Sequence, residues 1–210
     1  QQTYNSLTKF NRHLDIPFSE IDCNWLKRYE TWLRRQGKSE NTIGIRFRNI
    51  RMIFNLAMNM ELIKPENYPF KKFKVSKLYQ DTAKRALSKE EVLSIINYPI
   101  IGTDYYTKLA INLFTFSYFM GGINFVDMAY LTENNIIKNR LIYHRRKTGK
   151  LINLPMQQKA YMVLKEYEKS NEPYLFPILS SKHKTEQQRL NRLHKVITKV
   201  NKELKAIGEE

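Results

Sequence analysis

The protein has 210 residues, with 36 Lys and Arg against 20 Asp and Glu, and a formal charge of +16. Hydrophobic residues make up 42% and aromatic residues 12%, which excludes a disordered chain because this much apolar surface supports a packed core. The single cysteine, Cys23, excludes an intramolecular disulfide, and no Cys/His cluster has zinc-finger spacing. We therefore expect one or two domains in a reducing cytoplasm, without a metal site.

The surplus of positive charge favours nucleic acid as a partner over a merely basic, solvated surface. Residues 1–86 carry a net charge of +9 and residues 87–210 a net charge of +7, so the charge does not come from a basic tail. The first ten residues hold neither an initiator Met nor an apolar signal core, which indicates a fragment or a processed product. Residues 109–126 are uncharged, but their polar side chains and the Gly121-Gly122 pair favour a buried helix over a membrane span. We expect a soluble protein with no membrane partner.

The first part of the chain, residues 1–70, predicts a small all-helical domain. Apolar residues recur at helical spacing over residues 25–33, and Gly37 follows as a stop. A second helix begins near Ser39 or Asn41, either of which suits an N-cap. Its apolar stripe consists of Ile43, Phe47, Ile50, Phe54 and Ala57. Prolines after residue 64 end the helical region, which we expect to hold four helices, two of them strongly patterned.

Residues 71–86 predict an exposed basic linker, because they hold six basic residues and one acid without clean periodicity. The second domain, residues 87–210, begins at a capping box in which Ser88 is the N-cap and Glu91 lies three residues on. A β-hairpin is expected where residues 141–147 and 151–154 flank a turn containing Gly149. Helices are expected at residues 88–96, 104–120, 125–131, 157–169 and 185–207.

The tip of this hairpin carries the first candidate functional group, Lys147. Because side chains alternate faces along a strand, we expect Arg145 and Lys147 to lie on one face and Arg146 on the other. A lysine on a rigid β-ribbon can reach into a groove or donate a proton to the leaving oxygen of a phosphate ester. An exposed turn made soluble by basic residues explains the same pattern.

The second candidate is the sequence from Gly121 to Leu131. Asn124 suits the N-cap of a short helix, and Asp127 in its first turn gains from the helix dipole. That structural explanation is sufficient by itself. The sequence contains no phosphate-binding glycine loop, no GxSxG and no HExxH, and none of its four histidines begins an HxxR sequence. A helix-turn-helix regulator remains an open alternative.

Taken together, these elements resemble the tyrosine recombinase (phage integrase) family, most closely the integrases of Bacteroidetes mobile elements. The resemblance extends from about residue 3 to residue 205. It rests on these motifs, in chain order: WL at 32–33, GKSENTI at 37–43, IFN at 53–55 with Ala57, PENYPF at 65–70, ALSKEE at 86–91, GINFVDMAYL at 122–131 and RKTGK at 146–150. It implies a mainly α fold with a small β-hairpin, in which a SAM-like core-binding domain precedes the first part of a catalytic domain.

The resemblance also implies a reaction. In this family a tyrosine attacks the scissile phosphodiester to give a 3′-phosphotyrosyl enzyme, a 5′-hydroxyl reverses the step, and no metal or other cofactor takes part. Lys147 matches the hairpin lysine that is the family's candidate general acid. Asp127 matches the acidic residue that supports the site, three positions after the first catalytic arginine. The expected partners are double-stranded DNA, three further copies of the protein in a homotetramer on DNA, and accessory DNA-bending factors. When bound, the protein would be associated with the nucleoid.

Two departures from the family pattern stand out. Asn124 occupies the first-arginine position, and a neutral amide forms weaker bonds to phosphate than a charged donor does. We hypothesise that Arg145 supplies part of the missing charge. The 210 residues also hold no HxxR sequence, and their last tyrosine is Tyr174, so we expect the chain to bind DNA without cutting it.

The residues expected to contact DNA surround the second long helix and the start of the linker. They are Lys38, Asn41, Thr42, Arg46, Arg48, Lys71, Lys72 and Lys74. A solvated basic face is the alternative for each of them, and phosphate contacts would make binding strongly salt-dependent. Two other functions remain open: a non-catalytic DNA-binding regulator that reuses the fold, and a basic helical interaction protein without a DNA role.

Overall fold

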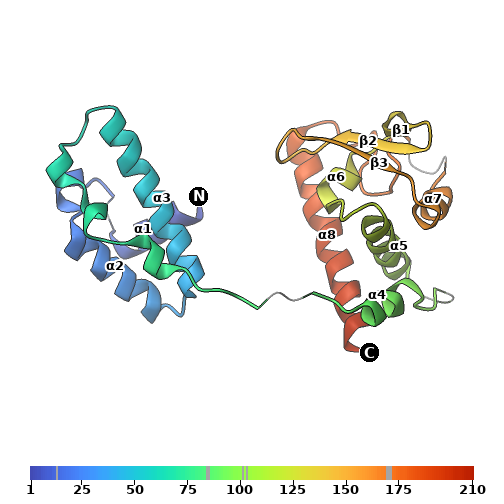
Figure 1. The fold of residues 1–210 in the computed structure, drawn as a ribbon, viewed down its shortest axis with the longest axis horizontal. Coiled ribbons are helices and arrows are strands. Elements are labelled where there is room, and N and C mark those ends of the chain that lie inside the picture. The colour runs from blue at the N-terminus through green and yellow to red at the C-terminus, as the bar shows by residue number, and fades with distance from the viewer. Residues whose placement is uncertain (13, 84–85, 101, 103, 169–171) are drawn as a thin grey trace. The chain divides into compact units, whose positions relative to one another are not determined.

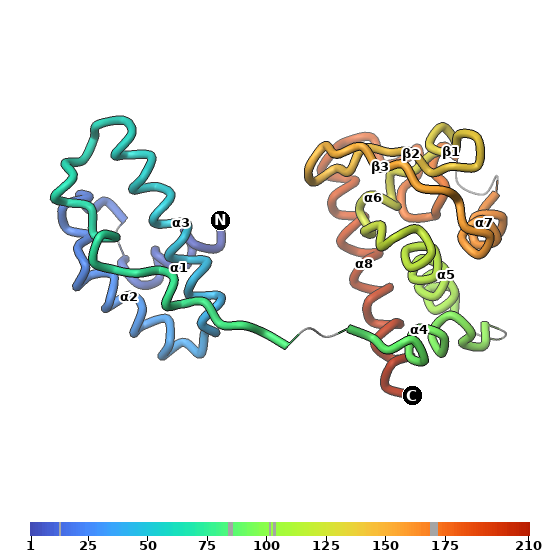
Figure 2. The backbone as a smooth tube through the Cα atoms, in the orientation of Figure 1, coloured from blue at the N-terminus to red at the C-terminus, as the bar shows by residue number. Residues whose placement is uncertain are grey.

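The computed structural model describes residues 1–12, 14–83, 86–100, 102, 104–168 and 172–210. It divides into two compact units, Gln1–Arg85 and Ala86–Glu210, which we describe separately (Figures 1 and 2). Within the described residues, no helix is long and apolar enough to cross a membrane. Most of the regular structure is helical, and one small antiparallel sheet completes it, which confirms the predicted fold class.

The described residues of the first unit form three α-helices, whereas we expected four. These are α1 (Gln2–Phe10), α2 (Cys23–Arg35) and α3 (Glu40–Asn59). The remaining helical pieces are short 3₁₀ segments at Phe18–Glu20, Pro65–Asn67, Pro69–Lys71 and Val75–Leu78. The closely spaced Pro65 and Pro69 explain why no further α-helix forms there, because proline lacks the N–H that a continuing helix requires.

An aromatic core holds the first unit together. Phe10 of α1 packs against Trp25 and Tyr29 of α2, with ring centroids 5.2 and 5.0 Å apart. The Tyr29 ring in turn lies 5.6 Å from that of Phe47 in α3. The Tyr29 hydroxyl donates a 2.7 Å hydrogen bond to Ser6 Oγ, and burial raises the pKa of this tyrosine. Ring pairs of this kind add specific geometry to the burial of a large apolar area.

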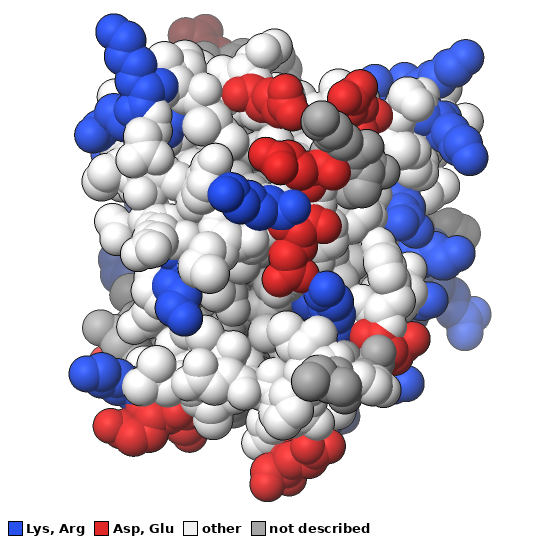
Figure 3. All heavy atoms as spheres, turned by 90° about the vertical axis from the view of Figure 1, so that its right-hand side faces the viewer, with Lys and Arg blue, Asp and Glu red and all other residues white. Residues whose placement is uncertain are grey.

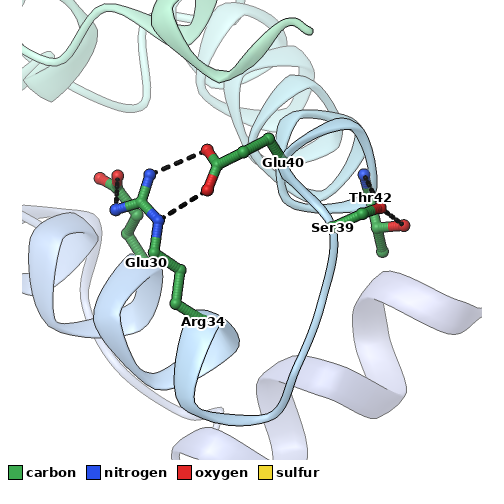
Figure 4. A network of polar contacts seen from close by, with 5 residues as sticks. All are labelled: Glu30, Arg34, Ser39, Glu40 and Thr42. Carbon is green, nitrogen blue, oxygen red and sulfur yellow. Dashed lines mark hydrogen bonds and ion pairs between the residues drawn. The ribbon is translucent and has the colours of Figure 1, made fainter. Parts of the chain in front are cut away.

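The turn between α2 and α3 is held by polar contacts on both sides (Figure 4). Gly37 adopts a φ of +67°, and Ser39, rather than Asn41, caps α3 by accepting a hydrogen bond from the Thr42 backbone N–H. The Arg34 guanidinium donates to both carboxylate oxygens of Glu40, at 2.7 and 2.8 Å. This bidentate contact lowers the pKa of Glu40 and connects the end of α2 to the beginning of α3.

The predicted linker begins later than residue 71. Phe73, Val75 and Leu78 are buried in the core of the first unit, and the Phe73 ring stacks on Phe47 with centroids 4.7 Å apart. Farther along, the side chain of Asn41 forms two hydrogen bonds with the backbone of Gln80. The linker prediction was wrong for residues 71–80, because 3₁₀ turns bury residues at spacings that match neither a helix nor a strand. The basic residues at 84 and 85 lie outside the described part.

Gly44 in α3 is the point at which this segment approaches the helix most closely. A Cβ built on Gly44 would lie 2.9 Å from the carbonyl oxygen of Leu78, a backbone atom that cannot rotate away. We expect Gly44→Ala to destabilise the first unit by about 2 kcal/mol, as overpacking typically does. Urea unfolding followed by tryptophan fluorescence measures this unit alone, because both tryptophans, Trp25 and Trp32, lie in it.

The matched control is Gly208→Ala in helix α8 (Glu186–Glu209) of the second unit, followed by far-ultraviolet circular dichroism because that unit has no tryptophan. A Cβ there meets nothing within 4 Å, so the change should be neutral or slightly stabilising, as Gly→Ala is in an open helix. If Gly44→Ala also left stability unchanged, the close packing of Leu78 on α3 would be wrong.

The second unit packs its helices around a buried one. Its helices are α4 (Lys89–Ile96), α5 (Tyr105–Phe119), α6 (Phe125–Ala129), α7 (Gln158–Lys165) and α8 (Glu186–Glu209). Helix α5 contacts α4, α7 and α8, and Figure 1 shows it beside α8. Its Phe116 is fully buried and meets Phe176 edge-on at 4.9 Å. The uncharged stretch in the sequence is therefore largely a core helix.

The start of α4 confirms the predicted capping box. The Ser88 hydroxyl oxygen accepts from the Glu91 backbone N–H at 3.2 Å, and the Glu91 carboxylate accepts from the Ser88 N–H at 2.6 Å. Both donors would otherwise lack a partner at the end of a helix.

The sheet has the strand order β1 (Ile136–Ile137), β2 (Arg140–His144) and β3 (Leu151–Pro155), with antiparallel neighbours. The predicted hairpin corresponds to β2 and β3, which pair from Arg140 opposite Pro155 to His144 opposite Leu151. Strand β1 was not predicted, because two residues are too few to show a period. It is joined to β2 by Lys138 and Asn139, which both have positive φ, as a two-residue hairpin turn requires.

Candidate functional site

Residues 145–150, which we call the basic turn, connect β2 to β3 and carry the candidate Lys147. Strand β2 ends at His144, so the expected alternation of Arg145 and Lys147 on one strand face was wrong. The chain turns here because the Arg145 carbonyl accepts from the Gly149 and Thr148 N–H groups at 2.7 and 3.2 Å. The φ of +69° at Gly149 completes the turn.

Asp127 attaches the basic turn to helix α6. It is 3% exposed, and its Oδ1 accepts a 2.9 Å hydrogen bond from the backbone N–H of Arg146. Its Oδ2 accepts a 2.7 Å hydrogen bond from Asn124 Nδ2. Both carboxylate oxygens therefore accept a hydrogen bond within the protein, and through them Asp127 holds the basic turn against α6.

Asn124 is the N-cap of α6, as the sequence indicated. Its Oδ1 accepts from the Asp127 backbone N–H at 3.0 Å, while its Nδ2 donates to the Asp127 side chain. Both ends of the amide are thus directed at its own helix. Capping α6 is therefore a sufficient structural reason for an asparagine at position 124. The second hydrogen of its amide NH₂ is the donor left for a ligand.

The charged side chains of the basic turn differ in what they contact. The Arg146 guanidinium lies over the Tyr130 ring, 3.7 Å from its centroid, a distance typical of a cation–π contact. Lys147 is exposed, and within the described part of the chain its side chain forms no hydrogen bond or ion pair. Arg145 is also exposed and lies near Tyr143, where its charge partly offsets the rise that burial causes in the pKa of that phenol. Lys147, Arg145 and the exposed Lys150 are therefore the turn residues available to a phosphate.

Two tyrosines near this site were not predicted. Tyr143 of β2 is half-buried, and burial raises its pKa, with a further rise from the nearby Asp127 carboxylate. Tyr130 caps the end of α6 and receives Arg146. The only sequence signal for Tyr130 is its spacing of three residues from Asp127, which places the two on one side of a helix.

Five of the eight predicted DNA contacts of the first unit lie on three separate surfaces. Lys38 and Arg46 line a hollow beside α1, where Arg46 Nη1 donates to Thr3 Oγ1 at 3.4 Å. Arg48 lines a second hollow with Arg51. Asn41 and Thr42 are used in the fold itself, through Gln80 and Ser39. Lys71 is exposed in its 3₁₀ turn.

The third surface gathers four lysines and is the most basic. We call it the lysine groove: Lys27, Lys72, Lys74 and Lys77. Its one acid, Glu30, forms a 2.6 Å ion pair with Arg34. Within the described residues none of the four lysines has an acidic partner, so their repulsion is uncompensated. Sequence reasoning found Lys72 and Lys74 but missed Lys27 and Lys77, because folding brings α2 beside a segment 45 residues later.

Part of the second unit is acidic, in contrast to the lysine groove of the first unit. A pocket of about 540 Å³ there is lined by three glutamates, Glu133, Glu168 and Glu172. Figure 3 views the protein from the side on which α7 lies in Figure 1, and acidic side chains gather over the upper middle of that face, with Lys and Arg side chains beside them. Such a group of glutamates repels a polyanion. Among the described residues, no group of three or more His, Cys, Asp or Glu side chains is placed to hold a metal ion.

Comparison with solved structures shows that the fold of this chain is similar to that of DNA-bound integrases. The chain superposes on a lambda integrase tetramer bound to a Holliday junction with a TM-score of 0.64 and 14% identity, covering 95% of this chain and 57% of that one. A lambda integrase (75–356) dimer bound to a COC′ core site gives 0.61 and 14%, covering 95% and 73%. The Tn1549 transposon integrase bound to transposon right-end DNA gives 0.58 and 16%, covering 79% and 57%.

The sequence itself matches one family model. Residues 1–75 match the model described as the phage integrase SAM-like domain. No curated protein matches the chain by sequence. The chain spans little more than half the length of the lambda integrase chain in the tetramer structure. Its first 75 residues are thus similar to the integrase SAM-like domain, and the chain as a whole has the integrase fold.

Proposed function

We propose that the protein is the DNA-binding part, with the beginning of the catalytic domain, of a tyrosine site-specific recombinase of a phage or of a Bacteroidetes-type mobile element. The observation that carries this proposal is the similarity to a DNA-bound integrase over 95% of the chain, both units included. The exposed Lys147 on a turn held by Asp127 supports it, since a fixed cation beside a phosphate can stabilise charge or donate a proton.

In this proposal Lys147 protonates the departing 5′-oxygen, and Arg145 and the free amide hydrogen of Asn124 contact the phosphate. In this proposal the 210 residues bind duplex DNA. They do not cleave it by themselves, because they hold no HxxR sequence. The whole recombinase would act as a homotetramer on two sites, with accessory DNA-bending factors as further candidates.

A non-catalytic DNA-binding regulator is the second candidate, and a specific observation favours it. Asn124 is neutral at the first-arginine position and is used as a helix cap, which is a structural role that needs no catalysis. The reading frame that encodes these residues separates the two candidates. An HxxR sequence followed by a tyrosine in that frame favours the recombinase, and a frame without them favours the regulator.

The test of DNA binding is the salt dependence of affinity for a 30-base-pair duplex, measured by fluorescence anisotropy. With about four phosphate contacts, affinity should fall about 100-fold between 50 and 200 mM salt. We expect Lys72→Gln/Lys74→Gln, in the lysine groove, to lower the salt slope by about two. The control is Lys205→Gln/Lys108→Gln, which removes two lysines that already have acidic partners and should leave the slope unchanged. A slope near zero in the unmodified protein would rule out the proposed function.

A further inference from the structure

We infer that Tyr130 is a positioning residue of the basic turn, acting through Arg146 on the placement of Lys147. The inference deepens the proposed function and rests on it where DNA is concerned. Arg146 attaches the basic turn to α6 and to Tyr130, the residue that follows this helix. Its backbone N–H donates to Asp127 Oδ1, and its guanidinium lies on the Tyr130 ring. One residue is thus held at both its backbone and its side chain, directly before Lys147.

The two anchors of Arg146 are Asp127 in helix α6 and Tyr130, the residue that caps the end of this helix. Asp127 and Tyr130 are three residues apart, which places them on neighbouring positions of the helix surface. The carboxylate fixes where the backbone of the turn lies. The aromatic face fixes the direction in which the Arg146 side chain leaves that backbone. One hydrogen bond alone would allow the peptide between Arg146 and Lys147 to rotate. The carboxylate and the aromatic ring together restrict that rotation.

Tyr130 is itself held in place from the other side. Its ring meets the Tyr174 ring edge-on, with centroids 6.3 Å apart and planes at 85°. The next residue, Leu131, accepts a 2.8 Å backbone hydrogen bond from Leu175, and Thr132 pairs with Tyr174 in an isolated β-bridge. The surface beneath Arg146 therefore belongs to the packed body of the unit, and the turn is attached to a rigid support.

This arrangement separates the roles of two adjacent cations. Arg146 directs its charge at the electron-rich face of a tyrosine, whereas Lys147 is exposed and has no protein partner among the described residues. Arg146 is then a positioning residue, and Lys147 is the residue presented to a phosphate. Without Tyr130, the Arg146 side chain would be free and Lys147 would sample a wider range of positions.

The first experiment measures positioning without DNA. Backbone ¹⁵N NMR of the 210-residue chain should show shifted amide signals at residues 145–149 in Tyr130→Leu, with a lower heteronuclear NOE at Lys147. Tyr130→Phe retains the ring and should leave these signals nearly unchanged. The matched control is Tyr161→Leu, which removes the ring beneath Lys165, a cation–π pair elsewhere in the same unit, and should not affect the basic turn.

The second experiment measures the consequence for DNA with a double-mutant cycle and a 30-base-pair duplex. Lys147→Ala should weaken binding about fivefold to tenfold near 0.1 M salt, as expected for one lost phosphate contact. We expect Tyr130→Leu to weaken it about threefold in the unmodified protein and to have no further effect once Lys147 is alanine. Tyr130→Phe should bind like the unmodified protein.

The two experiments distinguish failure of the inference about Tyr130 from failure of the proposed function. Unchanged NMR signals of the basic turn in Tyr130→Leu, or equal changes in Tyr130→Phe, overturn the inference whatever the DNA result. Independent, additive effects of Tyr130→Leu and Lys147→Ala on the affinity also overturn it. If the unmodified chain does not bind the duplex, the proposed function fails, while the NMR result still decides whether Tyr130 positions the turn.

Discussion

Replacing Asp127 with alanine is expected to destabilise the second unit by about 3 kcal/mol. The change leaves two donors, the Arg146 N–H and Asn124 Nδ2, without their carboxylate partner. Hydrogen bonds to a charged group contribute about 1.5–3 kcal/mol each, and a buried donor left unpaired has its own cost. Urea unfolding followed by far-ultraviolet circular dichroism measures the effect, because this unit has no tryptophan. Hydrogen exchange at the Arg146 amide should accelerate in parallel.

Two variants make this test specific to the carboxylate. Asp127→Asn keeps one oxygen but places an amide NH₂ beside a donor, so roughly half the effect should remain. Glu90→Ala removes an exposed acid from the first turn of α4 and should change stability by less than about 0.5 kcal/mol. If Asp127→Ala had no larger effect than Glu90→Ala, Asp127 could not be the anchor of the basic turn.

Replacing Phe73 with alanine is expected to destabilise the first unit by about 3–4 kcal/mol. Phe73 lies in the segment whose composition predicted a linker, but it is 7% exposed and stacks on Phe47. Loss of a buried phenylalanine removes its transfer free energy and leaves a cavity. Tryptophan fluorescence during urea unfolding reports this change, since Trp25 lies in the same core.

Tyr79→Ala provides the comparison within the same segment. Tyr79 is 65% exposed, so its loss should change stability by less than about 0.5 kcal/mol. Equal, small effects of Phe73→Ala and Tyr79→Ala would mean that residues 71–80 are the free linker that their charge suggested, and that the packing described for them is wrong.

Much of the secondary structure could be predicted because it depends on neighbours in the chain. The capping box of Ser88 and Glu91 and the cap at Ser39 are local contacts across three residues. The stripe that contains Phe47 and Phe54 identified the buried face of α3, as both are buried. These features follow from side chains and backbone a few residues apart, where spacing alone decides which groups meet.

The candidate site was predictable in its members but not in its geometry. The sequence singled out Lys147, Asp127 and Asn124, and whether they take part in catalysis remains a prediction. Their arrangement depends on a hydrogen bond between residues 127 and 146, which are 19 positions apart. The strand alternation assumed for Arg145 was wrong because β2 ends one residue earlier and the chain turns. No periodic pattern contains that information.

The sequence by itself determined most of the helices, the hairpin and the excess of positive charge, since each depends on composition or on spacing within one element. Tertiary structure alone decided which cations act together. It grouped Lys27 of α2 with Lys72, Lys74 and Lys77, and it placed Arg146 on Tyr130 beside an exposed Lys147. The physical reason is that the repulsion between lysines is screened beyond about 10 Å and the contact of a cation with a ring is lost beyond about 6 Å. They therefore depend on how the elements pack, which a single chain's periodicity does not encode.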